Sequence, residues 1–158
     1  MLNLETAKKK YADMLYRLAL SHLNNREDAE DAVQEAFVKY MRHLLPFSDE
    51  EHERAWLTRV TVNHCYDVLR YKSRRNHESI DDITEIAAEE QEINTEIFCI
   101  LDKLPAKNKT VIVLHYLEGF SVEEIALMLR ISVSAVKMRL SRGREQMRNE
   151  IEKEENHV

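Results

Sequence analysis

The chain has 158 residues, of which 44% are hydrophobic and 33% are charged, and its formal net charge is −6. Two glycines and two prolines are too few for a fold built on β-hairpins and long ordered loops. Apolar residues recur at helical spacing, so the sequence predicts an all-α protein. No apolar run is long enough for a signal peptide or a membrane span, and the two cysteines show no ligand spacing, so we expect a cytoplasmic protein with reduced thiols.

Residues 1–75 predict a first domain of three helices. The first helix is expected from about residue 6 to 23, and the second from a cap at Asp28 to about residue 44. The apolar face of the second helix has an unbroken three-four spacing, from Ala29 to Met41. A polar loop is expected to separate it from the third helix.

The third predicted helix runs from Arg54 to Arg75 after a loop over residues 45–53, and its C-terminal end is strongly basic. Basic side chains at that end also complement the helix dipole. We expect its inner face to consist of six residues: Trp56, Leu57, Val60, His64, Val68 and Leu69.

The negative charge is concentrated in the middle of the chain. Residues 76–100 hold eight Asp and Glu and no Lys or Arg, whereas the segments on either side are close to neutral. Residues 76–92 are therefore interpreted as an acidic linker. Periodic apolar residues return at about Ile93, which predicts a second helical domain over residues 93–158.

Two helices and a tight turn are predicted at about residues 121–148. Gly119 suits the end of a preceding helix, Ser121 and Glu124 form a capping box, and Ser132 can cap the next helix. That last helix is rich in Lys and Arg, which is typical of a helix-turn-helix whose second helix enters a DNA major groove. The alternative interpretation of this segment is a helical hairpin with a solvated basic face.

Signals of catalysis and of metal binding are absent from the sequence. There is no glycine-rich phosphate loop, no zinc-protease helix motif and no Cys-x-x-Cys. The neighbours His64 and Cys65 would point about 100° apart on a helix, which disfavours a shared metal ion. We therefore expect no enzyme activity, no catalytic residue, no metal or other cofactor and no small-molecule substrate.

Three stretches, in this order and spacing, resemble bacterial sigma factors. Residues 28–37 (DAEDAVQEAF) are similar to the polymerase-binding helix of region 2. Residues 56–75, which begin Trp-Leu-Thr-Arg and end Arg-Arg, are similar to the region 2 helix that engages the −10 promoter element. Residues 104–148 are similar to region 4, which reads the −35 element. A compact chain with only these two regions resembles the extracytoplasmic-function (ECF) group.

The resemblance implies a role for each matching residue. The residues implied to bind core polymerase are Asp31, Gln34 and Glu35. Those implied to bind the melted −10 element are Asn63, Asp67, Arg70, Arg74 and Arg75, and the loop at residues 45–53 would capture a flipped base. Those implied to bind the −35 duplex are Ser132, Ser134, Lys137, Met138, Arg139, Ser141, Arg142, Arg144 and Arg148.

The function implied is that of a transcription initiation factor, which binds core RNA polymerase, directs it to specific promoters and helps open the −10 region. An anti-sigma factor, often membrane-bound, is implied as a further partner. The acidic linker would either occupy a polymerase channel or act as a solubilising spacer. Two other functions remain open: a stand-alone helix-turn-helix transcriptional regulator and a helical interaction module with vestigial DNA contacts.

Overall fold

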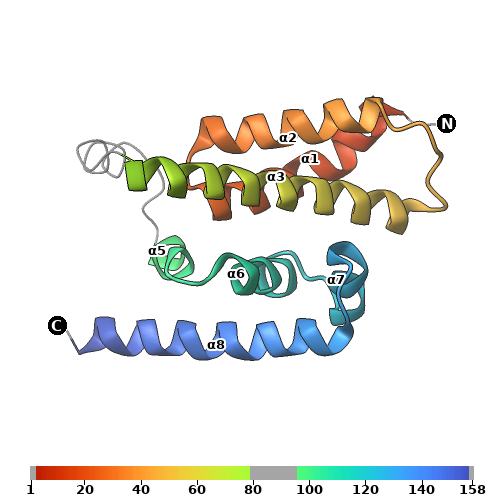
Figure 1. Cartoon of the computed structure of the whole chain (residues 1–158). Coiled ribbons are helices and arrows are strands. Elements are labelled where there is room, and N and C mark those ends of the chain that lie inside the picture. The colour runs from red at the N-terminus through yellow and green to blue at the C-terminus, as the bar shows by residue number, and fades with distance from the viewer. Residues whose placement is uncertain (1–2, 79–95, 157–158) are drawn as a thin grey trace. The chain divides into compact units, whose positions relative to one another are not determined.

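The computed structural model describes residues 3–78 and 96–156, and every regular element in these two ranges is helical (Figure 1). The prediction of an all-α fold is confirmed. The chain divides into two compact units, residues 1–93 and 94–158. Of the predicted linker over residues 76–92, the first three residues continue a helix and the rest lies outside the described residues. The predicted boundaries at 75 and 93 stay predictions.

The N-terminal unit is a bundle of three helices: α1 (Leu4–Leu23), α2 (Arg26–Met41) and α3 (Glu50–Glu78). Asn25 caps α2, since its side-chain oxygen accepts a hydrogen bond from the Asp28 amide at 2.9 Å. The predicted cap at Asp28 is therefore wrong. Asp28 instead forms an ion pair with Lys72, far along α3, with 2.8 Å between its Oδ2 and Nζ.

The third helix begins earlier than the sequence predicted. The side chain of Asp49 accepts a hydrogen bond from the amide of His52 at 2.7 Å, and Glu50 and Glu51 stand in the first turn. Carboxylates at these positions favour a helix start because they complement the unpaired amides and the helix dipole. The segment predicted as a loop over residues 45–53 therefore ends at Asp49.

The face that α3 buries also differs from the prediction. Trp56, Val60 and His64 are only half-buried. The hydroxyls of Thr58 and Thr61 each donate to a carbonyl one turn earlier in the helix, both at 2.8 Å, which lets two polar residues enter the core. The fully buried residues of α3 are Ala55, Leu57, Thr58, Thr61, Val62 and Cys65.

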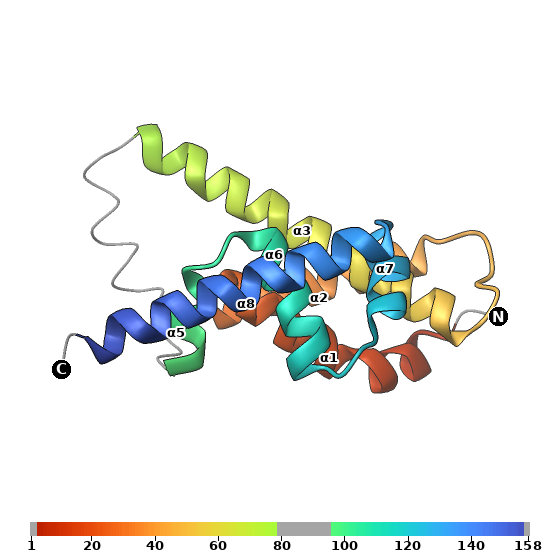
Figure 2. The ribbon, with the colours of Figure 1, turned by 90° about the horizontal axis from the view of Figure 1, so that it is seen from below.

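The C-terminal unit consists of shorter elements beside one long helix. These are α5 (Glu96–Asp102), α6 (Ala106–Ile112), a π-helical turn (Val113–Leu117), α7 (Val122–Leu129) and α8 (Val133–Glu155). In Figures 1 and 2, α7 lies at the N-terminal end of α8, α6 lies beside its middle, and α5 lies toward its C-terminal end.

The helix-turn-helix predicted at about residues 121–148 is present as α7 and α8. Gly119 has a φ of 77°, in the left-handed region that glycine adopts without steric cost. Ser121 and Glu124 form both hydrogen bonds of the capping box, at 3.1 and 3.0 Å. Arg130 turns the chain with a φ of 56°, and the Ser132 hydroxyl then accepts from the Ala135 amide at 3.0 Å. The predicted caps are confirmed.

A close contact places α8 against α6. Gly143 is buried, and a Cβ built on it would lie 2.7 and 2.9 Å from Cγ1 and Cδ1 of Ile112. The side-chain amide of Asn108 donates to the Gln146 side chain at 3.1 Å on the same side of α8. The glycine thus allows the two helices to approach more closely than any larger residue would.

Candidate functional site

The exposed face of α8 carries most of the residues predicted to bind the −35 element. Val136, Leu140 and Gly143 point into the core. Helical geometry places Met138 about 200° and Arg142 about 240° around the axis from Val136, away from the buried side of the helix. Met138 is 50% exposed, so its apolar side chain is accessible to a partner on this face. The exposed members of the predicted set are Ser132, Ser134, Lys137, Met138, Ser141, Arg142, Arg144 and Arg148.

Arginines stand on both flanks of this exposed face. Arg144 lies about 120° from Met138 in one direction around α8, and Arg139 lies about 100° from it in the other. Arg139 is half-buried, whereas Arg144 is exposed. When a helix lies in a groove, the middle of its DNA-facing side meets base edges and the two flanks of that side meet phosphates. Base contacts from Met138, Ser141 and Arg142, with phosphate contacts from Arg139 and Arg144, are compatible with this arrangement.

Sequence reasoning missed Tyr116, which lies beside this surface. The Nη1 atom of Arg144 donates a hydrogen bond to the Tyr116 hydroxyl at 3.0 Å, although the residues are 28 positions apart. Tyr116 belongs to the π-helical turn and is 54% exposed. No local sequence signal links the two residues, because the contact depends on how the turn and α8 pack.

The residues predicted to bind the −10 element form an exposed stripe on α3. Asn63, Asp67, Arg70 and Arg74 lie within about 60° of one another around the helix axis, and all four are exposed. Arg75 is also exposed but points about 100° away from Arg74. Asp67 forms an ion pair with Arg70, so part of the positive charge of the stripe is neutralised within it.

The residues predicted to bind core polymerase share the outer face of α2. Asp31 and Gln34 are exposed, and Glu35 is half-buried at the edge of the same face. Gln34 also lines an apolar groove of about 400 Å³ between α1 and α2. Met41, which the sequence assigned to the core, is 66% exposed beside this groove. The polar face of α2 is therefore continuous with an apolar surface that the sequence did not predict.

An aromatic cluster fixes the segment that connects α2 to α3. The ring of Phe47 stacks on His43 with 4.5 Å between ring centroids, and on Tyr40 at 5.9 Å. Trp56 lies against both Phe47 and His43, at 5.6 and 4.9 Å. Phe47 is the one Phe, Tyr or Trp in the loop over residues 45–53, which was predicted to capture a flipped base. In the structure its ring is already engaged by side chains of the protein.

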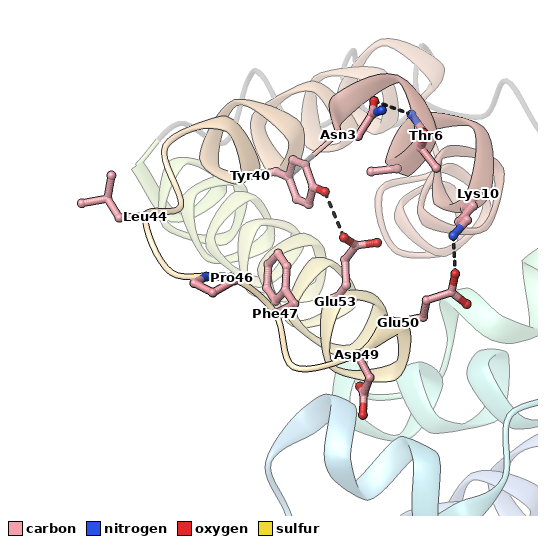
Figure 3. A pocket seen from close by; sticks show the side chains of 11 residues that line it. Asn3, Thr6, Lys10, Tyr40, Leu44, Pro46, Phe47, Asp49, Glu50 and Glu53 are labelled. Carbon is pink, nitrogen blue, oxygen red and sulfur yellow. Dashed lines mark hydrogen bonds and ion pairs between the residues drawn. The ribbon is translucent and has the colours of Figure 1, made fainter. Parts of the chain in front are cut away.

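A pocket of about 460 Å³ opens between this segment and the start of α1 (Figure 3). Lys10 forms an ion pair with Glu50 at its edge, and the Tyr40 hydroxyl donates to Glu53 Oε2 at 2.9 Å. Glu53 and Asn63 are ten residues apart on α3, about 15 Å along its axis. Asn63 and the other α3 residues predicted to bind the −10 element therefore do not line this pocket, whereas part of the loop predicted to capture a flipped base does.

Lys10, Tyr40 and Glu50, which line this pocket, all have pKa values shifted from their ordinary ones, and Tyr40 and Glu50 show the causes. Burial is the main cause that raises the pKa of Tyr40 from 10.0 to about 12, and the hydrogen bond to Glu53 is the next largest. The hydrogen bond and ion pair that Glu50 forms with Lys10 lower the pKa of this glutamate from its ordinary value. The neutral tyrosine and the ionised carboxylate are thus the forms that the folded unit favours.

Tyr40→Phe should reduce the loss of stability at high pH. Because the folded pKa of Tyr40 is raised, the contribution of its hydroxyl is complete below pH 10 and is lost as the pH rises through about 12. The variant lacks that hydroxyl, so its free energy of unfolding should fall less steeply across the same range. Urea unfolding at a series of alkaline pH values measures the slope, and equal slopes for variant and parent would contradict the assignment.

Among residues 3–78 and 96–156, no group of three or more His, Cys, Asp and Glu side chains could hold a metal ion. In the same ranges, no helix is both long enough and apolar enough to span a membrane.

Comparisons with known proteins match both units. The family described as Sigma-70 region 2 matches residues 8–75, and Sigma-70, region 4 matches residues 95–147. ECF RNA polymerase sigma factor SigE of Mycolicibacterium smegmatis is 32% identical, over 92% of this chain and 60% of its own length. RNA polymerase sigma factor SigV of Bacillus subtilis is 32% identical, over 89% of this chain and 86% of its own length.

Solved structures show the same fold. CnrH, in complex with the cytosolic domain of CnrY, superposes with a TM-score of 0.71 at 27% identity, covering 94% of this chain and 87% of that one. The sigma factor RpoE, in complex with the anti-sigma factor NepR from Bartonella quintana, gives a TM-score of 0.70. At 21% identity over 94% of this chain and 96% of that chain, the second likeness supports the fold alone.

Proposed function

The chain belongs to the ECF RNA polymerase sigma factors, and on this basis we propose that it binds core RNA polymerase and directs it to specific promoters. The single observation that carries the proposal is that both family regions present most of their predicted contact residues to solvent. A polar stripe on α3 and a basic face on α8 are exposed in the same chain. A stand-alone repressor or activator would need only the second of these surfaces.

The −35 duplex is the proposed ligand of α8. Its central residues Met138, Ser141 and Arg142 would meet base edges, with Arg142 placed to contact a guanine through two hydrogen bonds. Ser132 and Ser134 stand at the start of the helix, where backbone amides attract phosphate. Lys137 is a fourth proposed base contact. Arg139, Arg144 and Arg148 would bind phosphates at the sides of the groove.

The −10 element is the proposed ligand of the stripe on α3. The amide of Asn63 can both donate and accept, which suits the edge of an unpaired base. Arg74 and Arg75 are proposed phosphate ligands that orient the melted strand. Because Asp67 pairs with Arg70, these two residues would contact the strand as a unit.

Core RNA polymerase is the proposed partner of α2. Asp31, Gln34 and Glu35 would pair with basic groups of the polymerase, while the adjoining groove offers apolar area. Exposed charges of this kind contribute more to specificity and association rate than to affinity. The groove would then supply much of the binding energy, because burial of apolar surface is the dominant driving force in most protein association.

Regulation by an anti-sigma factor is part of the same proposal, and that partner could be anchored in a membrane. Support comes from CnrH, which is 27% identical to this chain and was solved in complex with the cytosolic domain of CnrY. We propose that the chain itself acts in the cytoplasm, as a dissociable subunit without enzymatic activity of its own.

Run-off transcription with purified core polymerase tests the proposal. Core polymerase alone should transcribe a pool of promoter-length fragments from no defined start, whereas the polymerase with the chain should select a subset with a defined start. A chain that binds those fragments tightly without polymerase, and adds no start sites, would instead be a stand-alone regulator. If the chain does not bind polymerase at all, the remaining function is that of a helical interaction module.

Arg142→Ala and Arg144→Ala should affect promoter binding in two different ways. Loss of a base-edge contact at Arg142 should reduce discrimination at one −35 position by about 1–3 kcal/mol. Loss of a phosphate contact at Arg144 should weaken all promoters alike and reduce the salt slope by about one unit. The two residues lie about 200° apart on α8, so they cannot face the same base.

A promoter library assayed with each variant polymerase at two salt concentrations measures both effects. If both variants lose affinity uniformly across the library, Arg142 is a backbone ligand as well. Specificity would then have to come from Lys137, Met138 and Ser141 or from the shape of the DNA.

A further inference from the structure

Arg144 is anchored within the protein before any partner binds. Its guanidinium donates one hydrogen bond to the Tyr116 hydroxyl at 3.0 Å. A guanidinium has five N–H donors, so four remain for other ligands, and the tyrosine hydroxyl can still donate its own proton. Arg148 lies one turn further on the same side of α8, and it has no hydrogen bond or ion pair among the described residues.

The backbone around Tyr116 is built in an uncommon way. The amide of Glu118 donates to the carbonyl of Val113 at 3.0 Å, five residues earlier, which is the π-helical pattern. A nitrogen of His115 lies 2.8 Å from the carbonyl oxygen of Phe120, which ties this turn to the start of the helix-turn-helix. π turns are rare, and they occur often at functional sites because they alter the direction in which side chains point.

We propose that Tyr116 is a positioning residue for promoter binding: it holds the Arg144 guanidinium on the flank of α8, where that group meets a phosphate of the −35 duplex. The inference rests on the proposed function. A long arginine side chain loses rotamer freedom when it binds, and this loss weakens binding. Tyr116 removes part of that freedom beforehand, so the bound arrangement is already populated in the unbound protein.

A double-mutant cycle tests the coupling. The full chain, assembled with core polymerase, is first used to select its preferred promoter duplex from a random pool. Affinities for that duplex are then measured for Tyr116→Phe, Arg144→Ala and the double variant, at low and high salt. Phenylalanine keeps the ring and removes only the hydroxyl, and thermal unfolding of each variant checks that the fold is intact.

Tyr116→Phe should weaken binding about two- to tenfold, the usual range for one hydrogen bond. In the Arg144→Ala background the same change should have almost no effect, whereas in an Arg148→Ala background its full effect should remain. The loss should also shrink at high salt, because it acts through a phosphate contact.

An equal loss in the Arg144→Ala background, or no loss with Arg144 present, would overturn the inference alone. In the first case the tyrosine would contact DNA by itself or act through the fold. A parent holoenzyme that selects no duplex would overturn the proposed function and this inference together, so the two failures are distinguishable.

Discussion

Asp31→Arg combined with Gln34→Ala should lower the affinity of the chain for core RNA polymerase by about 100-fold or more, without unfolding it. Both side chains are exposed on the side of α2 opposite Ala32 and Ala36, which are fully buried. The proposed partner surface is basic, and like charges brought together at an interface cost several kcal/mol. A loss of about 2.8 kcal/mol already corresponds to a 100-fold change.

Equilibrium binding of labelled chain to core polymerase measures this loss, and circular dichroism reports the helical content. Asp13→Arg is the matched control, because it makes the same charge reversal at an exposed position of α1, about 180° around that helix from Leu4, which lines the groove. We expect that control to bind nearly as well as the parent. Parent-like binding by the double variant would show that this face of α2 does not contact polymerase.

Gly143→Val should lower the free energy of unfolding of the C-terminal unit by about 3 kcal/mol. A Cβ at this position would lie 2.7 and 2.9 Å from two atoms of Ile112, which is too close for two nonbonded carbons. Ile112 is only 2% exposed, so its side chain has no open space to move into. Helices α6 and α8 must therefore separate, which also moves the exposed face of α8 relative to the rest of the unit.

Hydrogen exchange of the α6 and α8 amides measures the local free energy of opening. Asn149→Val is the matched control, since it places the same residue on the exposed side of α8. Combining Gly143→Val with Ile112→Ala should recover part of the loss, because the smaller side chain leaves space for the valine. Undiminished protection in Gly143→Val would mean that the two helices are not held together at this point.

Local chemistry made the helix-turn-helix predictable. The bonds between Ser121 and Glu124 span three residues, as does the bond from Ala135 to Ser132. Interactions of this range depend on residue type and spacing, and hardly on the rest of the fold. Gly119 was predictable for the same reason, since its backbone conformation is one that few other residues adopt easily.

Competition between similar local signals produced the errors in the N-terminal unit. Asn25 is as good a capping residue as Asp28, where the cap was predicted, so residue type alone does not distinguish the two. The structure decides because Asp28 has a partner, Lys72, 44 residues away. Similarly, Thr58 and Thr61 were excluded from the predicted core as polar residues, although hydroxyls bonded to the preceding turn allow them to be buried.

Periodicity, caps and motifs lie in neighbouring residues, so the helices, the helix-turn-helix and the family could be predicted without any coordinates. Three features depend on how the elements pack together. Tyr116 forms a hydrogen bond with Arg144, Gly143 leaves space for the side chain of Ile112, and Met41 borders a groove instead of filling the core. Each of these depends on the approach of two helices or turns that are distant in the chain. Such an approach is set by the packing of many side chains at once, so no short stretch of sequence specifies it.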